Sequence, residues 1–248
     1  MVYLNRLFYF CTMKNKTIKR NLVLGILFFL PVIFLLFLYP AKHNYTPLDS
    51  VKASVLDLSN LPTLENKDAT FKDKITVLSF FGENPENYIT EASNLKELVY
   101  DNFTGFKGFQ MVSIFPIEAK EEALRLQKEL TKFKPLEYWQ FVFASKEDIN
   151  RLFSSFRTSK YLNYEGFVSE VYIIDKELQQ RGRLDDRSKK EIEKNAPIYP
   201  LTSYNASEVS VLKNKMSEDV RILFTEYRQK RKGEFNSDTR RSEDLKSK

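Results

Sequence analysis

The chain has 248 residues, 39 basic and 33 acidic side chains, a formal net charge of +6 and one cysteine, Cys11. Residues 1–41 hold five of the basic side chains and no acidic one, which leaves 34 basic and 33 acidic side chains in residues 42–248. Nucleic-acid binding needs a concentrated basic face, so we expect no nucleic-acid partner. Residues 42–248 contain no cysteine, which excludes disulfides and thiolate chemistry from that part.

Residues 22–39 form an uncharged apolar run, LVLGILFFLPVIFLLFLY. As a helix at about 1.5 Å per residue, the run would be roughly 27 Å long, which matches the hydrocarbon thickness of a bilayer. Four basic residues precede it, so the positive-inside bias predicts a transmembrane helix with residues 1–21 in the cytoplasm. A cleavable signal peptide is the alternative, but the run is long for one, and Tyr39-Pro40-Ala41 is a poor cleavage site.

The remaining boundaries follow from composition. Met13 begins a basic lead, MKNKTIKR, into the apolar run, and is therefore a candidate start that would leave Cys11 upstream. Residues 40–67 are expected to be a stalk that joins the domain through an edge strand, near Val55 to Leu58. Residues 68–230 suit one globular domain. Residues 231–248 are polar and are predicted to be a disordered tail.

Apolar periodicity in the domain predicts alternating strands and helices. Strands are expected at 74–81, 109–115 and 138–144, each followed by a helix: 89–99, 119–133, and one capped by Ser145 and running through Phe156. A hairpin is expected at 168–174 and 178–184, and after an irregular excursion a long helix carries Val209, Leu212, Met216, Val220, Leu223 and Tyr227. The first three strands should be parallel, and the hairpin should add an antiparallel edge.

This order of elements predicts an α/β, thioredoxin-like fold, with a mixed central sheet flanked by helices and one N-terminal transmembrane helix. Three segments sharpen the comparison: 75–88, then Val171 to Asp175 with the Arg-rich 181–186, and Tyr204-Asn205-Ala206. They resemble the Sco/SenC family, membrane-anchored thioredoxin-like proteins that assist copper insertion into cytochrome c oxidase, and in particular Bacteroidetes-type members. The resemblance covers roughly residues 50–230.

The chain departs from that family at the copper ligands, which are two cysteines in the loop after the central strand and one histidine before the hairpin. Alignment through Phe80-Phe81 and Pro85 puts Asn84 and Tyr88 at the cysteine positions, and counting back from Asp175 puts Phe167 at the histidine position. Amide, phenol and phenyl groups do not replace the soft ligands that select copper. We therefore expect a degenerate member with no metal, no cofactor and no catalytic residues.

Other polar clusters have simpler interpretations. Glu83 and Glu86 could form an acid–base pair or a hard-metal site, but acids near a helix N-terminus also favour the helix dipole. Asp185 and Asp186 with Arg181, Arg183 and Arg187 could bind phosphate or a cation, but we expect a solvated hairpin end. His43 is expected to lie at the membrane interface, and Trp139 in the core.

The sequence thus predicts a bacterial inner-membrane protein with a periplasmic domain that is not an enzyme and acts as a binding or assembly factor. The resemblance implies respiratory-oxidase biogenesis, with the oxidase or its assembly factors as envelope partners. The alternatives are an envelope enzyme with a non-thiol site in the Gly82–Tyr88 loop, or a structural envelope protein unrelated to the oxidase.

Overall fold

The computed structural model describes residues 16–38, 46–59, 69–132 and 134–233. The chain divides into two compact units, Met1–Tyr45 and Thr46–Lys248. In the first unit, α1 (Lys16–Leu38) includes Pro31, and its segment Lys19–Phe37 has a mean hydropathy of 2.3, which by length and composition is enough to cross a membrane. Met13, Cys11, the Tyr39–Ala41 segment and His43 lie outside the described residues.

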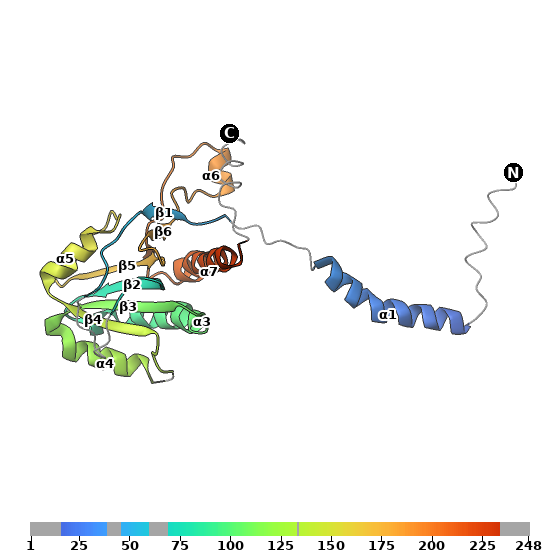
Figure 1. Cartoon of the computed structure of the whole chain (residues 1–248), viewed down its shortest axis with the longest axis horizontal. Helices are drawn as coiled ribbons and strands as arrows, with labels where there is room; N and C mark the ends of the chain where they lie inside the picture. The colour runs from blue at the N-terminus through green and yellow to red at the C-terminus, as the bar shows by residue number, and fades with distance from the viewer. Residues whose placement is uncertain (1–15, 39–45, 60–68, 133, 234–248) are drawn as a thin grey trace. The chain divides into compact units, whose positions relative to one another are not determined.

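The second unit is built on a mixed sheet with the strand order β1-β6-β5-β2-β3-β4 (Figure 1). Parallel pairing joins β2 to β3 and β3 to β4, whereas β5 runs antiparallel to β2 and forms a hairpin with β6. The strands are β1 (Asp49–Lys52), β2 (Ile75–Phe81), β3 (Phe109–Pro116), β4 (Trp139–Ala144), β5 (Phe167–Ile174), β6 (Gln180–Gly182) and β7 (Tyr204–Asn205), which pairs with β5. This strand order, with a closing helix, is a thioredoxin-like fold, as the sequence predicts.

Helices cover both faces of the sheet, which explains why every residue of β2 and β3 is buried. Along β2, Val77 packs into one apolar core and Leu78 into the other, because successive side chains of a strand point to opposite faces. The first core is closed by η2 (Pro85–Tyr88), α2 (Ile89–Leu95), η3 (Lys96–Tyr100), α3 (Asp101–Phe103), η4 (Ile117–Ala119), α4 (Lys120–Leu130), η5 (Val211–Met216) and α7 (Ser217–Lys232). The second is closed by α5 (Lys146–Ser154) and the segment before β2.

The structure differs from the sequence-based boundaries at both ends of the domain. The edge strand exists, but it is β1, paired with β6, whereas Val55 and Leu58 lie in the second core. Residues 46–59 are therefore packed parts of the domain and not an independent stalk. At the other end, α7 continues to Lys232, so the first residues of the expected tail are helical.

Two details of the excursion and of the last helix were not expected. The excursion contains a short helix, α6 (Lys189–Glu193), with a capping box between Ser188 and Glu191. The last helix opens with the π-helical η5, and Val209 is half exposed at its start rather than part of the buried stripe. Val209 precedes the π-helical turn, and the buried stripe begins at Leu212 and continues through Met216 and Val220 to Leu223.

The expectation that the end of the hairpin is solvated is wrong, because Arg181 and Arg183 form ion pairs with buried carboxylates of the domain. Arg181 is 5% exposed and donates to Asp175 (2.9 Å), Glu226 (2.7 Å) and the Leu48 carbonyl (2.7 Å). Arg183 forms a hydrogen-bonded pair with Asp219, whose carboxylate also accepts from Tyr204 at 2.6 Å. Burial by itself would lower the pKa of Arg181, but the Glu226 and Asp175 carboxylates outweigh it and raise the pKa, so the guanidinium stays charged.

Removing Arg181 should leave two buried carboxylates without their main partner. We expect Arg181→Ala to lower the free energy of unfolding by about 3–5 kcal/mol, measured by urea denaturation of the chain from Thr46 onward. Arg228→Ala, at an exposed position of the neighbouring helix, is the control and should change stability by less than about 0.5 kcal/mol. Equal effects of the two substitutions would contradict the structural role of Arg181.

Candidate functional site

Two loops meet where β2 ends and β5 begins. The first, residues 82–88, follows β2, and the second, residues 163–166, precedes β5. The Glu83 amide donates to the Glu165 carbonyl at 3.0 Å, and the Asn163 amide donates to the Phe167 carbonyl at 2.8 Å. In the sequence these loops lie about eighty residues apart, and the sheet alone brings them together, since β2 and β5 are neighbours.

The three positions that alignment assigns to the family ligands lie together in this place. Asn84 donates from Nδ2 to Glu165 Oε1 at 3.0 Å, and the Tyr88 hydroxyl donates to Glu165 Oε2 at 3.1 Å. The Tyr88 ring stacks on the Phe167 ring, with 3.3 Å between centroids and 5° between planes. We call Asn84, Tyr88, Glu165 and Phe167 the Glu165 cluster.

Glu165 holds the cluster together, although the sequence pattern did not point to this residue. The residue is only 7% exposed, and its carboxylate also accepts from the Tyr164 hydroxyl at 3.1 Å. The hydrogen bond from Asn84 lowers the pKa of Glu165 below its ordinary value, with help from the Tyr164 and Tyr88 hydroxyls and against the effect of burial. A signal was present in the sequence: an acidic residue and a glycine, Glu165-Gly166, stand directly before the position aligned with the histidine.

The phenol of Tyr88 is held in a donating state. Burial is the largest cause that raises its pKa, and the Glu165 carboxylate raises it further. The same hydroxyl accepts from Asn163 Nδ2 at 3.1 Å, so the phenol bridges Asn163 and Glu165. The Tyr88 hydroxyl thus has both a donor and an acceptor partner within the domain.

Gly82 permits the close approach of the two loops. Its φ angle of +68° lies in the left-handed region, which side chains other than glycine disfavour. A Cβ atom at this position would lie 2.8 Å from the Glu165 carbonyl oxygen and 3.0 Å from the Phe167 nitrogen. The cluster therefore depends on glycine where β2 ends.

The two glutamates of the first loop lie outside the cluster and have partners of their own. Glu83 pairs with Lys146, and this pairing raises the pKa of the lysine. Glu86 lies 3.8 Å from Arg125, with both side chains more than half exposed. The structure shows two separate surface ion pairs here, and not an acid–base dyad.

The other residues considered at the sequence level have structural roles. Ser145 caps α5 by accepting from the Asp148 amide at 3.1 Å. Trp139 is buried and donates to Ser113 at 2.8 Å, which confirms its place in the core.

The donor set of the Glu165 cluster does not fit copper. One carboxylate, one amide and one phenol are hard or neutral oxygen and nitrogen groups, and Phe167 offers no donor, whereas copper sites use thiolate, thioether or imidazole ligands. Among the described residues, no group of three or more His, Cys, Asp or Glu side chains is placed to hold a metal ion.

A small cavity of about 50 Å³ lies beside the cluster. Pockets for small molecules usually measure about 300–1,000 Å³, so this one is too small for a drug-sized ligand. Its lining combines the second loop with α5 and the end of β3: Pro116, Lys146, Ile149, Asn150, Leu162, Asn163, Tyr164 and Gly166.

No family model matches the chain, and its sequence matches no curated protein. Similar solved structures include BsSco, a member of the Sco family of cytochrome c oxidase assembly proteins, with 12% identity over 74% of this chain and 99% of that one and a TM-score of 0.45. Arabidopsis thaliana ScoI with copper bound has 17% identity over 68% and 99%, with a TM-score of 0.43. The thioredoxin domain of a Bacteroides vulgatus thiol-disulfide oxidoreductase has 15% identity over 62% and 100%, with a TM-score of 0.39.

Sco family and thioredoxin-like Bacteroides proteins are thus structural neighbours of this chain, as the resemblance in sequence predicts. The fold itself is established by the strand order, since similarities this distant add no argument to it. The loss of the copper ligands at Asn84, Tyr88 and Phe167 stays a prediction.

The lowered pKa of Glu165 gives a test by acid titration. A folded-state pKa below the unfolded value stabilises the fold above the unfolded pKa of about 4.3, and this contribution is lost as the pH falls through the lower folded value. We therefore expect the stability difference between wild type and Glu165→Gln to shrink as the pH falls below about 4.3, measured by urea denaturation at each pH. Glu121→Gln, at an exposed position of α4, should follow wild type, and a difference for Glu165→Gln that stays constant with pH would contradict the assignment.

Proposed function

We propose that this protein is a membrane-anchored, periplasmic thioredoxin-like binding or assembly factor of the Sco/SenC-like class that uses neither redox nor copper chemistry. α1 supports the anchor, since it is long and apolar enough to span a bilayer. The basic residues before the apolar run favour a cytoplasmic N-terminus and an inner-membrane location, with the domain in the periplasm.

One observation carries this proposal. The positions expected for the two cysteines and the histidine do converge, but they hold side chains that satisfy one another. Asn84 and Tyr88 donate to Glu165, and Tyr88 stacks on Phe167, so the cluster offers neither a thiolate nor an open ligand set. These contacts support the proposal that the three aligned positions have structural roles in this chain.

Catalysis is not part of the proposal, because the carboxylates of this region are engaged. Glu165 accepts three hydrogen bonds from side chains, and Glu83 and Glu86 face cations. A general acid or base needs a carboxylate that can reach a substrate and exchange a proton with it. These contacts favour a binding role over the alternative of an enzyme with a non-thiol site.

Copper titration tests the altered site. We expect no binding of Cu(I) with a Kd below about 1 μM by the wild-type chain, and such binding by the triple variant Asn84→Cys, Tyr88→Cys, Phe167→His under reducing conditions, because the three positions converge. The control places the second cysteine at Thr90 instead of Tyr88 and should bind more weakly. Tight binding by the wild type would refute the loss of the site, and a folded triple variant that binds no better than the control would refute the alignment.

The assembly role needs a partner test. Affinity-tagged full-length chain, purified from its native membranes in mild detergent, should carry respiratory oxidase subunits or haem–copper assembly factors, identified by mass spectrometry. A tagged version of α1 with its flanking residues alone is the control, because it keeps the anchor and lacks the domain. Recovery of the same proteins by that control, or of none of them by the full chain, would favour the structural envelope protein instead.

A further inference from the structure

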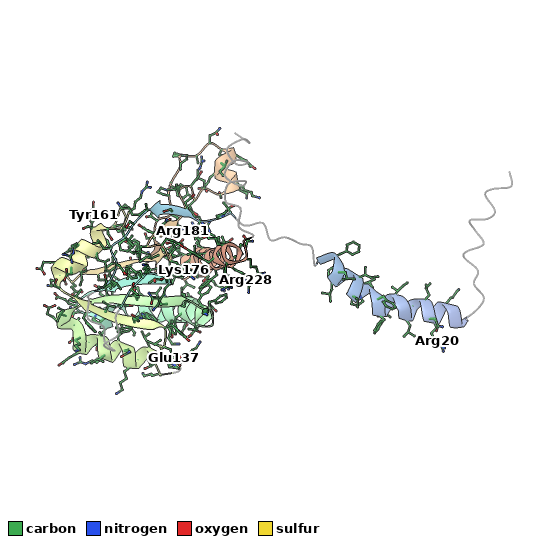
Figure 2. The ribbon with its side chains drawn as sticks, viewed as in Figure 1. Arg20, Glu137, Tyr161, Lys176, Arg181 and Arg228 are labelled. Atoms are coloured by element: carbon green, nitrogen blue, oxygen red, sulfur yellow. The ribbon has the colours of Figure 1, made fainter. Side chains whose placement is uncertain are left out.

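A group of cations lies at the edge of the domain where β2 and β3 begin and β5 ends. It consists of Lys176, in the turn after β5, and Arg228, Lys230, Arg231 and Lys232, in the last turns of α7; we call these five residues the basic pole. Lys176 and Lys230 both lie against the Tyr227 ring, at 5.2 and 4.8 Å from its centroid. The turn and the helix end are therefore side by side. Figure 2 labels one residue of each, Lys176 and Arg228.

Of the acids beside the pole, Glu226 and Asp175 are buried in ion pairs, whereas Glu177 and Asp73 are exposed, and the amide of Asp73 donates to the Lys176 carbonyl at 3.1 Å. Residues 227–232 contain four basic side chains and no acidic one. Before them, Glu226 is buried between Arg181 (2.7 Å) and Lys230 (2.9 Å). Glu177 accepts from the Tyr227 hydroxyl, and Asp175 is buried against Arg181. Arg228, Arg231 and Lys232 are exposed, so basic side chains outnumber the exposed acids Asp73 and Glu177 at the surface of the pole.

The basic pole also lies where the chain enters the domain. Arg181 Nη2 donates both to the Leu48 carbonyl and to Glu226, so these two residues share one guanidinium nitrogen. From Glu226 to Lys232, the helix rises only about 9 Å. Nine residues lie between Leu38, where α1 ends, and Leu48, and the ten steps from one to the other at about 3.5 Å each reach at most about 35 Å.

We propose that the basic pole binds the anionic headgroups of the phospholipid bilayer that α1 crosses. Arginine and lysine side chains form charge-assisted hydrogen bonds with phosphate, and each basic residue near an anionic membrane strengthens binding about fivefold. The proposal rests on the anchor part of the proposed function and is independent of the copper and oxidase parts. Bound in this way, the domain would keep the Glu165 cluster, at the opposite end of β2, accessible to a protein partner.

If the basic residues of the pole only stabilised the C-terminal end of α7, Lys176 would have no reason to lie beside them. Basic residues in a last turn complement the partial negative charge of the helix C-terminus. Lys176 belongs to a different element, yet it lies over the same ring as Lys230. A helix-dipole role also predicts an effect on stability that does not depend on lipid, which separates the two interpretations.

The test uses the full-length chain reconstituted in liposomes of phosphatidylcholine, with or without about 30% phosphatidylglycerol, a content at which each contacting charge should gain about fivefold in binding. Lysine acetylation read by mass spectrometry reports access to each side chain. Acetylation of Lys176, Lys230 and Lys232 should slow severalfold with phosphatidylglycerol and recover at about 0.5 M salt, where charges are screened. Lys120 and Lys128 of α4 serve as internal references and should not change.

A variant and its matched control complete the test. Arg228→Gln, Arg231→Gln, Lys232→Gln keeps the Lys230–Glu226 pair and should remove the protection of Lys176 by phosphatidylglycerol. Lys120→Gln, Arg125→Gln, Lys128→Gln removes the same number of exposed charges from α4 and should keep that protection. Equal acetylation of the pole in both liposomes, or equal loss of protection in both variants, would overturn the proposal. Flotation with phosphatidylcholine liposomes reports the anchor separately.

Discussion

The buried guanidinium of Arg181 is the contact on which the arrangement of this domain depends. It binds the turn after β5 through Asp175, the last helix through Glu226 and the entering chain through the Leu48 carbonyl. A buried charge is stable only when its partners are present with good geometry. Arg181 therefore requires β6, α7 and the N-terminal entry to pack at one place, and the basic pole lies on the same helix just beyond Glu226.

At the opposite end of the sheet, two loops of the thioredoxin-like fold meet around Glu165. The loop after β2 and the loop before β5 come together there because β2 pairs with β5 and because the glycine at position 82 permits a close approach. The side chains at the meeting point bond to Glu165 and stack on Phe167. The polar groups of this cluster thus bond to one another across the two loops.

Most elements could be predicted from the pattern of apolar residues. β2, β3 and β4, the Ser145 cap and the hairpin were predicted close to their observed positions, because burial on one or both faces leaves a clear period in the sequence. The predictions failed where the spacing of apolar residues gives no information about tertiary contacts. Val209 was expected in the buried stripe but is half exposed ahead of the π-helical turn. The arginines of residues 181–187 were expected in solvent because sequence alone does not show buried carboxylates nearby.

The sequence by itself determined the apolar segment that suits a membrane anchor, the absence of cysteine after Cys11, the alternation of strands and helices, and the three positions Asn84, Tyr88 and Phe167. Only the tertiary structure revealed that these three positions meet around Glu165, and that Lys176 lies beside the end of α7. The physical reason is that composition and periodicity are local properties of the chain. A buried carboxylate or a basic surface is created by strands and helices that are far apart in sequence and neighbours in space.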